Sequence, residues 1–447
     1  MPAHFDRRTL LKAALLSALP AALPRGAFAQ MPREVDVIIV GAGAAGIAAA
    51  RRLSAQGRSH VILEALPRIG GRIAGTISPF GTPADLGAHR LYTPRQNPLV
   101  AYAEANKFEL YAPLLSRRLY LGMREARDAE YDDFTAAVRR TARAIAAAGE
   151  VGQDLPATSV LPDLGDWHGT ASFLLGPLTS GVELDRISTV DFSRAAERSE
   201  ELAARAGMAA LILAASRGIP VQLNTPVRAI QVAAKRNVVV ETSRGAVQAH
   251  AVIVTASPGV LAAGMIRFSP SLPERISSAL LRMTMGVQNR IAFELPGNPL
   301  RLKDDETILF RALGRRTMRL VGRVGGTDTA YADIGGAFAR ELSGAGEREM
   351  LAFVREMLTA HFGADVAKRV GWSAIARWDR EEYFRGSHAA VQPGFAGARR
   401  TLFDAANERI FFAGEAIHET HYGTVAGAML SGERAALAAL RVLPAKR

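Results

Sequence analysis

Three glycines and one downstream carboxylate form the clearest chemical pattern in this 447-residue sequence. The segment GAGAAG at 41–46 follows a short apolar run, and Glu64 ends the next such run. Gly41 permits a tight turn off a strand, Gly43 lets the backbone approach a pyrophosphate, and Gly46 lets the following helix lie close to the sheet. A carboxylate at Glu64 accepts hydrogen bonds from ribose hydroxyls. The pattern predicts a dinucleotide site; a chance glycine-rich helix start is the alternative.

A second glycine segment favours FAD over NAD. Gly70, Gly71 and Arg72 lie just past Glu64 and combine close backbone approach with a guanidinium suited to phosphate. Further segments are DLGA at 85–88, PV at 226–227, FAGEA at 412–416 and GTVAGA at 423–428. In this order, the set resembles the flavin-containing amine oxidase superfamily, which includes monoamine oxidases, polyamine oxidases, histone demethylases and L-amino-acid oxidases.

The resemblance implies noncovalent FAD and gives individual residues roles. Glu64 would hold the adenosine ribose, Arg72 the phosphate region, Val227 the adenine, Glu415 the ribityl chain and Val425 the flavin pyrimidine edge. Trp378 matches a tryptophan that lies against the flavin, although Trp378 and Val227 also suit core positions. The residues predicted to contact FAD are Gly41, Gly43, Ala45, Gly46, Glu64, Gly71, Arg72, Gly87, Ala88, His89, Arg90, Val227, Gly414, Glu415, Thr424 and Val425.

The chemistry implied is hydride transfer from the carbon next to an amine nitrogen to the flavin, which needs no protein nucleophile. The predicted catalytic residues are Arg290 and Trp378. Arg290 occupies the position of a lysine that, in many relatives, bonds through water to the flavin. Arginine keeps the charge but not the tunable pKa of lysine. The electron acceptor is therefore either oxygen or another molecule.

Four residues are candidates for substrate binding. Arg90 lies in a segment similar to the part of L-amino-acid oxidases that supplies a carboxylate-binding arginine, and a bidentate fork there selects amino acids. A structural or phosphate-facing Arg90 is the alternative. Monoamine oxidases enclose the substrate in a cage of aromatic side chains, and this chain has Thr424 and the pair Ser387-His388 at the matching positions. The cage is therefore open, or rebuilt from the side chains of His388, His421 and Tyr422. Each histidine could equally be structural.

These features predict an FAD-dependent amine oxidase. It would convert a primary or secondary amine, or an L-amino acid, to an imine that water hydrolyses, with oxygen giving hydrogen peroxide. One alternative is a flavin dehydrogenase or desaturase acting on C–C bonds, as in protoporphyrinogen oxidase or carotenoid desaturases. Another is a non-catalytic binding protein that keeps the FAD fold.

The positioning elements indicate an α/β protein with a Rossmann-like FAD-binding domain and an interleaved α+β substrate domain. Strands are expected at 34–40, 60–64, 221–223, 238–242, 251–255 and 409–415, and helices at 47–56 and 425–440. An alternating stretch runs from 287 to 295. The predicted domains are 33–92, 205–267 and 376–447 for FAD, and 93–204 and 268–375 for substrate.

Composition excludes several classes of site. Arginine accounts for nearly all of the 55 basic residues and is scattered along the chain, so the net charge of +12 does not predict nucleic-acid binding. Without cysteine there is no disulfide, thiolate metal site or cysteinyl flavin, and histidine spacing predicts no metal site.

The first residues resemble a twin-arginine signal peptide. Arg7 and Arg8 precede an apolar stretch too short to span a bilayer, and Ala27 and Ala29 suit cleavage after residue 29. A basic tail is the alternative. The prediction is recognition by the twin-arginine export machinery and a periplasmic or secreted protein with no stable membrane span.

Overall fold

The computed structural model describes residues 31–114, 116–232, 237–404 and 408–445. The predicted signal peptide at 1–29 lies outside these residues. Residues 33–447 form one unit, which is described below.

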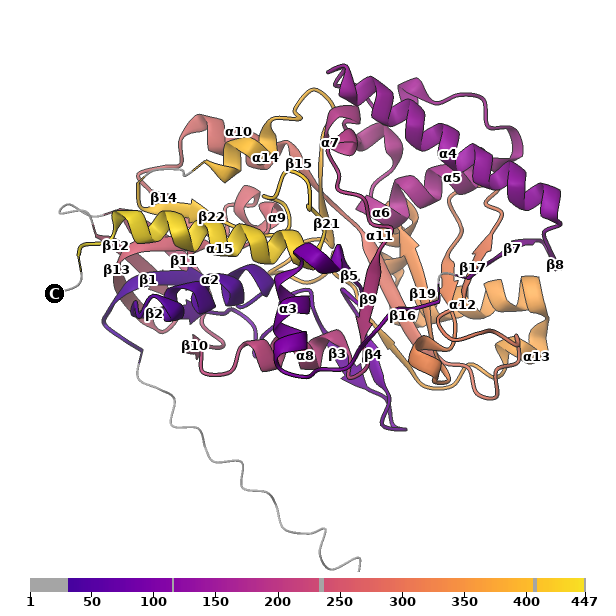
Figure 1. The fold of residues 1–447 in the computed structure, drawn as a ribbon, viewed down its shortest axis with the longest axis horizontal. Coiled ribbons are helices and arrows are strands. Elements are labelled where there is room, and N and C mark those ends of the chain that lie inside the picture. Colours follow the sequence, from indigo (N-terminus) through magenta and orange to yellow (C-terminus); the bar gives the residue numbers. More distant parts are fainter. Residues whose placement is uncertain (1–30, 115, 233–236, 405–407, 446–447) are drawn as a thin grey trace, which may run out of the picture. The chain divides into compact units, whose positions relative to one another are not determined.

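Two large sheets organise this unit (Figure 1). The first has the order β10-β2-β1-β13-β12-β11-β14, with β22 also paired to β13. Its core strands are runs of valine and isoleucine, as expected for a parallel sheet buried on both faces. Its strands are β1 (Glu34–Val40), β2 (His60–Leu63), β10 (Val221–Gln222), β11 (Val227–Val232), β12 (Val238–Thr242), β13 (Gly245–Val254), β14 (Arg267–Ser269) and β22 (Ile410–Phe412).

The carboxyl ends of four parallel strands meet at one edge of this sheet. Val40 of β1 is in register with Leu63 of β2 and with Val254 of β13, and Val254 is in register with Phe412 of β22. Ligands of open α/β sheets bind beyond this edge. The residues that follow these strands therefore lie together although they are up to several hundred positions apart in the chain.

Two helices pack together beside the first sheet: α2 (Ala44–Ala55) directly follows β1, and α15 (Val425–Val442) lies along α2 (Figure 1). Small residues permit this close approach, since a Cβ on Gly432 of α15 would lie 2.1 Å from the carbonyl oxygen of Ala45. With α3 (Pro98–Ala105) and α8 (Met208–Ala215), these helices contribute to one core cluster.

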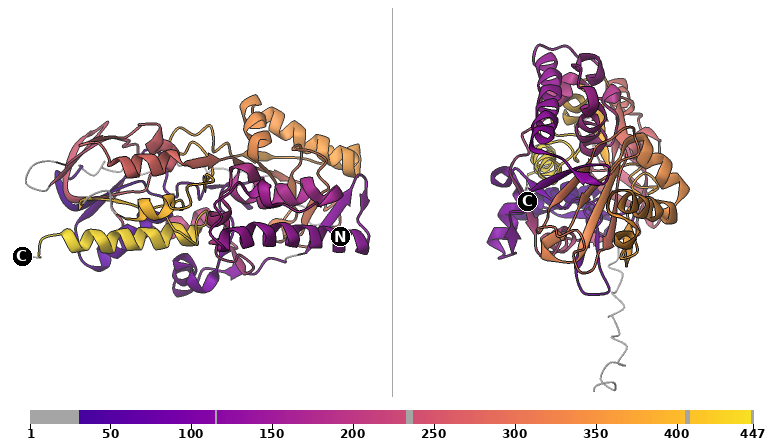
Figure 2. Two further views of the ribbon diagram at one scale, coloured as in Figure 1. Left: turned by 90° about the horizontal axis from the view of Figure 1, so that it is seen from above. Right: turned by 90° about the vertical axis from the view of Figure 1, so that its right-hand side faces the viewer.

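The second sheet has the order β20-β16-β19-β18-β17-β7-β8. Alternate residues of its strands face opposite sides, and Ile291, Phe310 and Leu320 pack on the side of α11 (Gly336–Ala345) and α12 (Glu347–Phe362). Helices α4 (Asp128–Glu150) and α5 (His168–Leu175) cover part of the other side, against Leu119 and Leu309 (Figure 2). The strands are β7 (Arg117–Leu121), β8 (Arg124–Glu125), β16 (Gln288–Glu294), β17 (Thr307–Phe310), β18 (Arg319–Val321), β19 (Thr329–Gly335) and β20 (Ser373–Ile375).

The remaining elements are short. The short strands are β3 (Gly75–Ile77), β4 (Pro83–Asp85), β5 (Leu91–Tyr92), β6 (Leu110–Tyr111), β9 (Glu201–Ala204), β15 (Met283–Gly286) and β21 (His388–Val391). The remaining α-helices are α6 (Pro177–Ser180), α7 (Thr189–Ser193), α9 (Pro258–Ala262), α10 (Glu274–Leu281), α13 (Ala364–Ala367) and α14 (Ala398–Phe403). Short 3-10 turns are Pro94–Gln96, Ala157–Val160, Gly165–Trp167, Leu184–Arg186 and Val324–Gly326.

This arrangement confirms the predicted fold class, with a dinucleotide-type sheet and an interleaved second domain built on its own sheet. The chain crosses between the sheets several times, as expected, while the predicted domain boundaries stay a prediction. Among the described residues, no helix has both the length and the apolarity required to cross a membrane.

Candidate active site

A cavity of about 730 Å³ begins at the carboxyl edge of the first sheet and extends to the second sheet. Its volume is typical of a site for a cofactor or a small ligand. The predicted residues that line it are Gly41, Gly43, Ala45, Glu64, Gly71, Arg72, Gly87, Ala88, His89, Arg90, Val227, Arg290, Trp378, His388, Gly414, Glu415, Thr424 and Val425.

The glycine loop lies at one end of the cavity. Gly41 has φ +102°, and a Cβ there would lie 2.5 Å from the Oγ1 of Thr255. Gly46 does not line the cavity; it lies behind the loop, where a Cβ would meet the carbonyl oxygen of Gly41 at 2.0 Å. A Cβ on Gly71 would lie 3.2 Å from the Cα of Gly43. Side chains at these positions would therefore push apart the backbones that form the cradle.

Glu64 holds the loop from the end of β2. Its Oε2 accepts a hydrogen bond from the Ala42 N–H at 2.7 Å, and its Oε1 accepts one from the Leu66 N–H at 2.8 Å. Burial raises the pKa of Glu64, and these backbone N–H groups partly oppose that shift. The carboxylate is thus fixed in the cavity wall with acceptor lone pairs remaining for a ligand hydroxyl.

Glu415 and Arg72 connect distant segments beside the loop. The Nη1 of Arg72 donates to the Oε1 of Glu415 at 3.0 Å and to the carbonyl oxygen of Ser387 at 2.6 Å. Glu415 also accepts the N–H groups of Ala389 and Gly423, both at 3.1 Å. Three chain segments therefore converge on one carboxylate.

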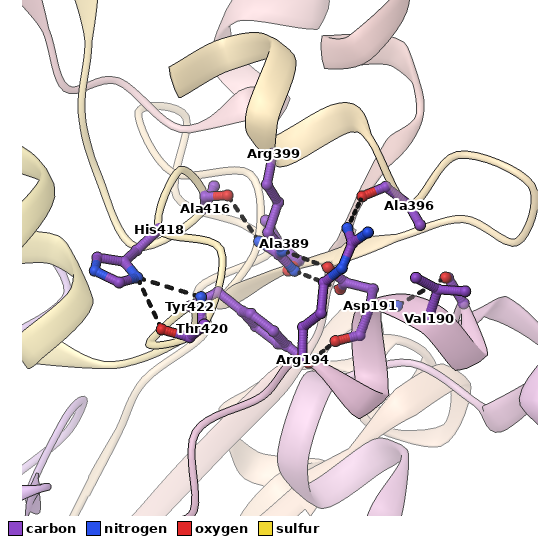
Figure 3. Close-up of polar contacts among 12 residues, drawn as sticks. Val190, Asp191, Arg194, Ala389, Ala396, Arg399, Ala416, His418, Thr420 and Tyr422 are labelled. Atoms are coloured by element: carbon purple, nitrogen blue, oxygen red, sulfur yellow. Dashed lines mark hydrogen bonds and ion pairs between the residues drawn. The ribbon is translucent and has the colours of Figure 1, made fainter. Parts of the chain in front are cut away.

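A buried network around Arg399 connects the segments of Ala389 and Ala416 to helix α7 (Figure 3). Arg399 of α14 binds Asp191 with both ends of its guanidinium, at 2.8 and 2.9 Å, and donates to the carbonyl oxygens of Ala389 and Ala416. Tyr422 stacks on this guanidinium, 3.8 Å from its ring centroid, and its hydroxyl donates to the carbonyl oxygen of Asp191. The network fixes the positions of β21 and of the loop that carries Glu415.

This network uses the ring and the hydroxyl of Tyr422, whose predicted contact with substrate stays a prediction. Tyr422 does not line the cavity, because its ring and hydroxyl are used by Arg399 and Asp191. His421, the other candidate in this segment, packs against His418 with ring centroids 5.0 Å apart and does not line the cavity either.

Thr424 caps helix α15. Its Oγ1 accepts the Gly427 N–H at 3.0 Å and donates to the carbonyl oxygen of His421 at 2.6 Å. Its hydroxyl is therefore occupied, although the residue lines the cavity. Val425 begins the helix, so the positive end of the helix dipole points at the cavity.

His388, the remaining cage candidate, does line the cavity from β21. Within the described part of the chain, its Nδ1 is buried and has no hydrogen-bond partner. Burial lowers the pKa of His388 to about 4; Glu415 opposes this shift, whereas Arg72 and Arg198 add to it. The imidazole is consequently neutral at pH 7.

Arg290 lies in β16 and enters the cavity wall as part of an ion pair. Its Nε donates to the Oδ1 of Asp333 at 2.7 Å, and its Nη1 donates to the carbonyl oxygen of Gly87 at 2.9 Å. The Nη2 of Arg290 and the Nε of Arg319 both donate to the other oxygen of Asp333. Burial would raise the pKa of Asp333, but the two arginines lower it to about 2. Arg290 is therefore a fixed cation.

Trp378 lies beside this group. Its N–H on the backbone donates to the Oδ1 of Asn289 at 3.0 Å, and its ring packs edge-on against Phe384. A Cβ on Gly87 would lie 3.0 Å from the indole. The flat indole thus forms a fixed part of the cavity wall next to the segment that holds Arg290.

Arg90 lines the cavity but is already paired. Its Nε lies 3.3 Å from the Oε1 of Glu201, and its Nη2 lies 3.2 Å from the Oδ1 of Asp305. Burial alone would lower the pKa of Arg90, but the two carboxylates raise it. The alternative of a structural Arg90 accounts for both contacts.

Further cavity residues were not found by sequence reasoning. The tyrosines and charged residues among them are Tyr92, Arg117, Arg198, Glu201, Arg319, Asp333 and Tyr383. For Arg290, the partner of Asp333, the sequence does hold a signal. The alternation of the 287–295 stretch places Arg290 on the face of the strand opposite Ile291. Nothing local in the sequence joins β16 to Asp333 of β19 or Arg319 of β18.

The cradle, the fixed carboxylate at Glu64 and the cavity beyond them define a flavoprotein of the dinucleotide-binding type. The model of the flavin containing amine oxidoreductase family matches this chain in two overlapping stretches, residues 44–201 and 117–440. The chain belongs to this family.

Curated proteins similar to this chain include histone demethylase homologs and a polyamine oxidase. Lysine-specific histone demethylase 1 homolog 3 of Arabidopsis thaliana is 25% identical over 92% of this chain and 30% of its own length. Lysine-specific histone demethylase 1 homolog 1 of Oryza sativa is 27% identical, over 90% of this chain and 52% of its own length. The chain therefore spans only about a third to a half of these relatives. Polyamine oxidase 4 of Oryza sativa is 26% identical, over 90% of this chain and 88% of its own length.

A solved structure of putrescine oxidase bound to putrescine has a similar fold. It superposes with a TM-score of 0.76 over 90% of this chain and 98% of its own, at 18% sequence identity. The identity is low, so the likeness concerns the fold.

FAD is the cofactor of this protein, and the residues present fit it. Gly41, Gly43 and Gly71 line the cavity without side chains, which leaves their backbone open to phosphates, and Glu64 offers an acceptor for ribose. Because the chain has no cysteine, no cysteinyl bond joins the flavin to it, and FAD is held noncovalently.

Proposed function

We propose that this protein is an FAD-dependent amine oxidase that acts on a primary or secondary amine of small size. The observation that carries this proposal is the single cavity that runs from Glu64 at the dinucleotide edge to Trp378 and Arg290 near the second sheet. When bound, FAD supplies a hydride acceptor for the carbon next to the amine nitrogen.

The chain's own residues bind and orient in this proposal. Trp378 and the Gly87 segment supply a fixed wall against which a substrate is positioned. Arg290 cannot give up a proton, because its charge is held by Asp333. His388 lines the wall as a neutral imidazole, so it adds no positive charge beside an amine substrate.

The acceptor we propose is oxygen, with hydrogen peroxide as the product. The test mixes purified protein with amines anaerobically and follows bleaching of the flavin absorbance, then admits oxygen and measures peroxide. Bleaching by amines followed by peroxide release supports the proposal. Bleaching by a porphyrinogen or polyene, with none by amines, would instead identify a dehydrogenase acting on C–C bonds; no bleaching at all would indicate a binding protein.

We also propose that the protein is exported through the twin-arginine pathway to the periplasm or beyond. The support is the sequence Arg7-Arg8 before the apolar stretch. Replacing both arginines with lysine in the full chain should leave the yellow holoprotein in the cytoplasmic fraction. Unchanged export of the double variant would contradict the proposal.

A further inference from the structure

The end of the cavity formed by the second sheet and the segment before β9 is rich in guanidinium groups. Five arginines line the cavity there: Arg90, Arg117, Arg198, Arg290 and Arg319. Three carboxylates form ion pairs with them, namely Glu201, Asp305 and Asp333, and the buried Asp85 lies close to Arg290 and Arg90. Positive charge therefore exceeds negative charge in this wall.

All three carboxylates are already occupied. Glu201 and Asp305 both hold Arg90, at 3.3 and 3.2 Å. Asp333 accepts hydrogen bonds from Arg290 on both oxygens, and one of these oxygens also accepts from Arg319. A cationic group of a substrate would find no unpaired carboxylate among these three, and like charges brought together in a desolvated site repel each other strongly.

Arg117 is different from the other arginines. Within the described ranges, no hydrogen bond or ion pair involves its guanidinium, and Arg117, an exposed residue, is among those that line the cavity. Arg198, by comparison, donates to the carbonyl oxygen of Tyr422 at 2.7 Å. A guanidinium carries five N–H donors, so Arg117 has a full fork available for an acceptor.

The sheet explains how Arg117 comes to face this cluster. Residues of β7 alternate between its two faces, so Arg117 lies on the same side as Leu119. Leu119 pairs in register with Leu309 of β17, which in turn pairs with Arg319 of β18. Burial and the nearby charge of Arg319 lower the pKa of Arg117, in agreement with this proximity.

We propose that Arg117, next to Arg319, binds an acid group of the substrate, so that the protein oxidises amines that also carry a carboxylate. This inference rests on the proposed function and specifies its substrate class. Recognition is assigned to Arg117 instead of Arg90, because Arg90 already has two carboxylate partners. A planar fork suits a carboxylate with two parallel hydrogen bonds.

Pairs of amines that differ only in a carboxylate provide the test. Ornithine is compared with putrescine, and tyrosine with tyramine, by anaerobic flavin reduction over a range of concentrations. We expect the acid member of at least one pair to reduce the flavin at concentrations about 10–100-fold lower than its partner, as a charge-assisted bidentate contact implies.

Variants assign the effect to Arg117. Arg117→Gln should raise the concentration needed for the acid substrate by about 10–100-fold and leave the limiting reduction rate nearly unchanged. Arg117→Lys should recover part of the loss, since it keeps the charge but not the fork. Arg348→Gln is the matched control, because that side chain is 92% exposed on α12 and lies outside the cavity.

A second readout does not depend on turnover. Titration with benzoate, a carboxylate without an amine, should perturb the flavin spectrum of the holoprotein and lose affinity in Arg117→Gln. Flavin reduction by putrescine or tyramine in preference to ornithine or tyrosine would overturn this inference and leave the proposed function standing. So would an equal effect of Arg117→Gln on both members of a pair. Reduction by neither kind of amine would overturn the proposed function as well.

Discussion

Glu64 gives the sharpest prediction at the scale of single residues. The change Glu64→Gln keeps the shape of the side chain but removes the charge that accepts the Ala42 and Leu66 N–H groups and a ribose hydroxyl. Hydrogen bonds to charged groups contribute about 1.5–3 kcal/mol, so we expect the Kd for FAD to rise about 10–100-fold. Fluorescence titration of apoprotein with FAD measures it. Glu356→Gln, at a side chain 61% exposed, is the control; equal Kd values would contradict the assigned role.

Asp85 predicts a pH dependence of stability. Burial raises the pKa of Asp85 from 3.8 to about 6, against the opposing effects of Arg290 and the Met208 N–H. A carboxyl whose pKa is raised on folding stabilises the fold below its unfolded pKa, and this contribution is lost as pH rises through the folded pKa. Asp85→Asn removes the ionisation. Its free energy of unfolding relative to wild type should thus rise between about pH 4 and pH 7, by on the order of 1–3 kcal/mol.

Urea unfolding at several pH values tests this expectation, and Asp365→Asn, at a side chain 96% exposed, is the control. A difference between Asp85→Asn and wild type that stays constant over this range would show that Asp85 does not ionise there.

Residues differ in how far the sequence predicts them. Gly41 and Glu64 were predictable because a turn, a close approach and a ribose acceptor are local demands on residue type. The contacts of Tyr422 were not predictable, because its partner Asp191 is 231 residues away and no local pattern joins them. Arg117 was missed for a related reason: its significance depends on strand order in a sheet, and arginine is common throughout the chain.

At the scale of elements, prediction succeeded where one periodicity dominated. The strand at 34–40 has the predicted bounds, and the helix predicted at 425–440 is α15 at 425–442. The helix predicted at 47–56 begins earlier, at Ala44, with Gly43 as its N-cap residue. The strand predicted at 251–255 is the last part of the longer β13 (Gly245–Val254), whose earlier residues pair with the antiparallel β12.

The contact of α15 with α2 predicts that small residues there are required. Gly432→Ala would place a Cβ 2.1 Å from the carbonyl oxygen of Ala45, so the helices must separate. Overpacking of this kind costs about 1–3 kcal/mol, and the displaced α2 carries the glycine loop. We expect a lower Tm together with weaker FAD binding, measured by thermal unfolding and by titration.

The matched control for this element is Gly314→Ala, because a Cβ at Gly314 has no heavy atom within 4 Å. If Gly432→Ala resembled Gly314→Ala in both Tm and Kd, the close packing of α15 on α2 would not position the cofactor site.

For the whole molecule, the site exists only because two interleaved sheets share one cavity. Glu64 follows a strand of the first sheet, whereas Arg290, Arg319 and Asp333 belong to the second. The alternating order of FAD and substrate segments in the sequence predicted that two domains contribute residues to the site. Strand order and register in the second sheet arise from tertiary packing, so the charge balance of the far wall could not be predicted from local patterns.

This shared cavity predicts that FAD stabilises the entire fold. A ligand that binds only the folded state adds RT ln(1 + [L]/Kd), or about 2.7 kcal/mol at a free concentration of about 100 Kd. For a chain of this size, we expect the Tm of the apoprotein to rise by about 3–8 °C in saturating FAD. Far-UV circular dichroism and release of flavin fluorescence should report the same transition, since both sheets contribute to the cavity. NADP is the control, because the Glu64 carboxylate repels a 2′-phosphate. A Tm that does not respond to FAD, or that rises equally with NADP, would contradict the assignment of the cavity as an FAD site.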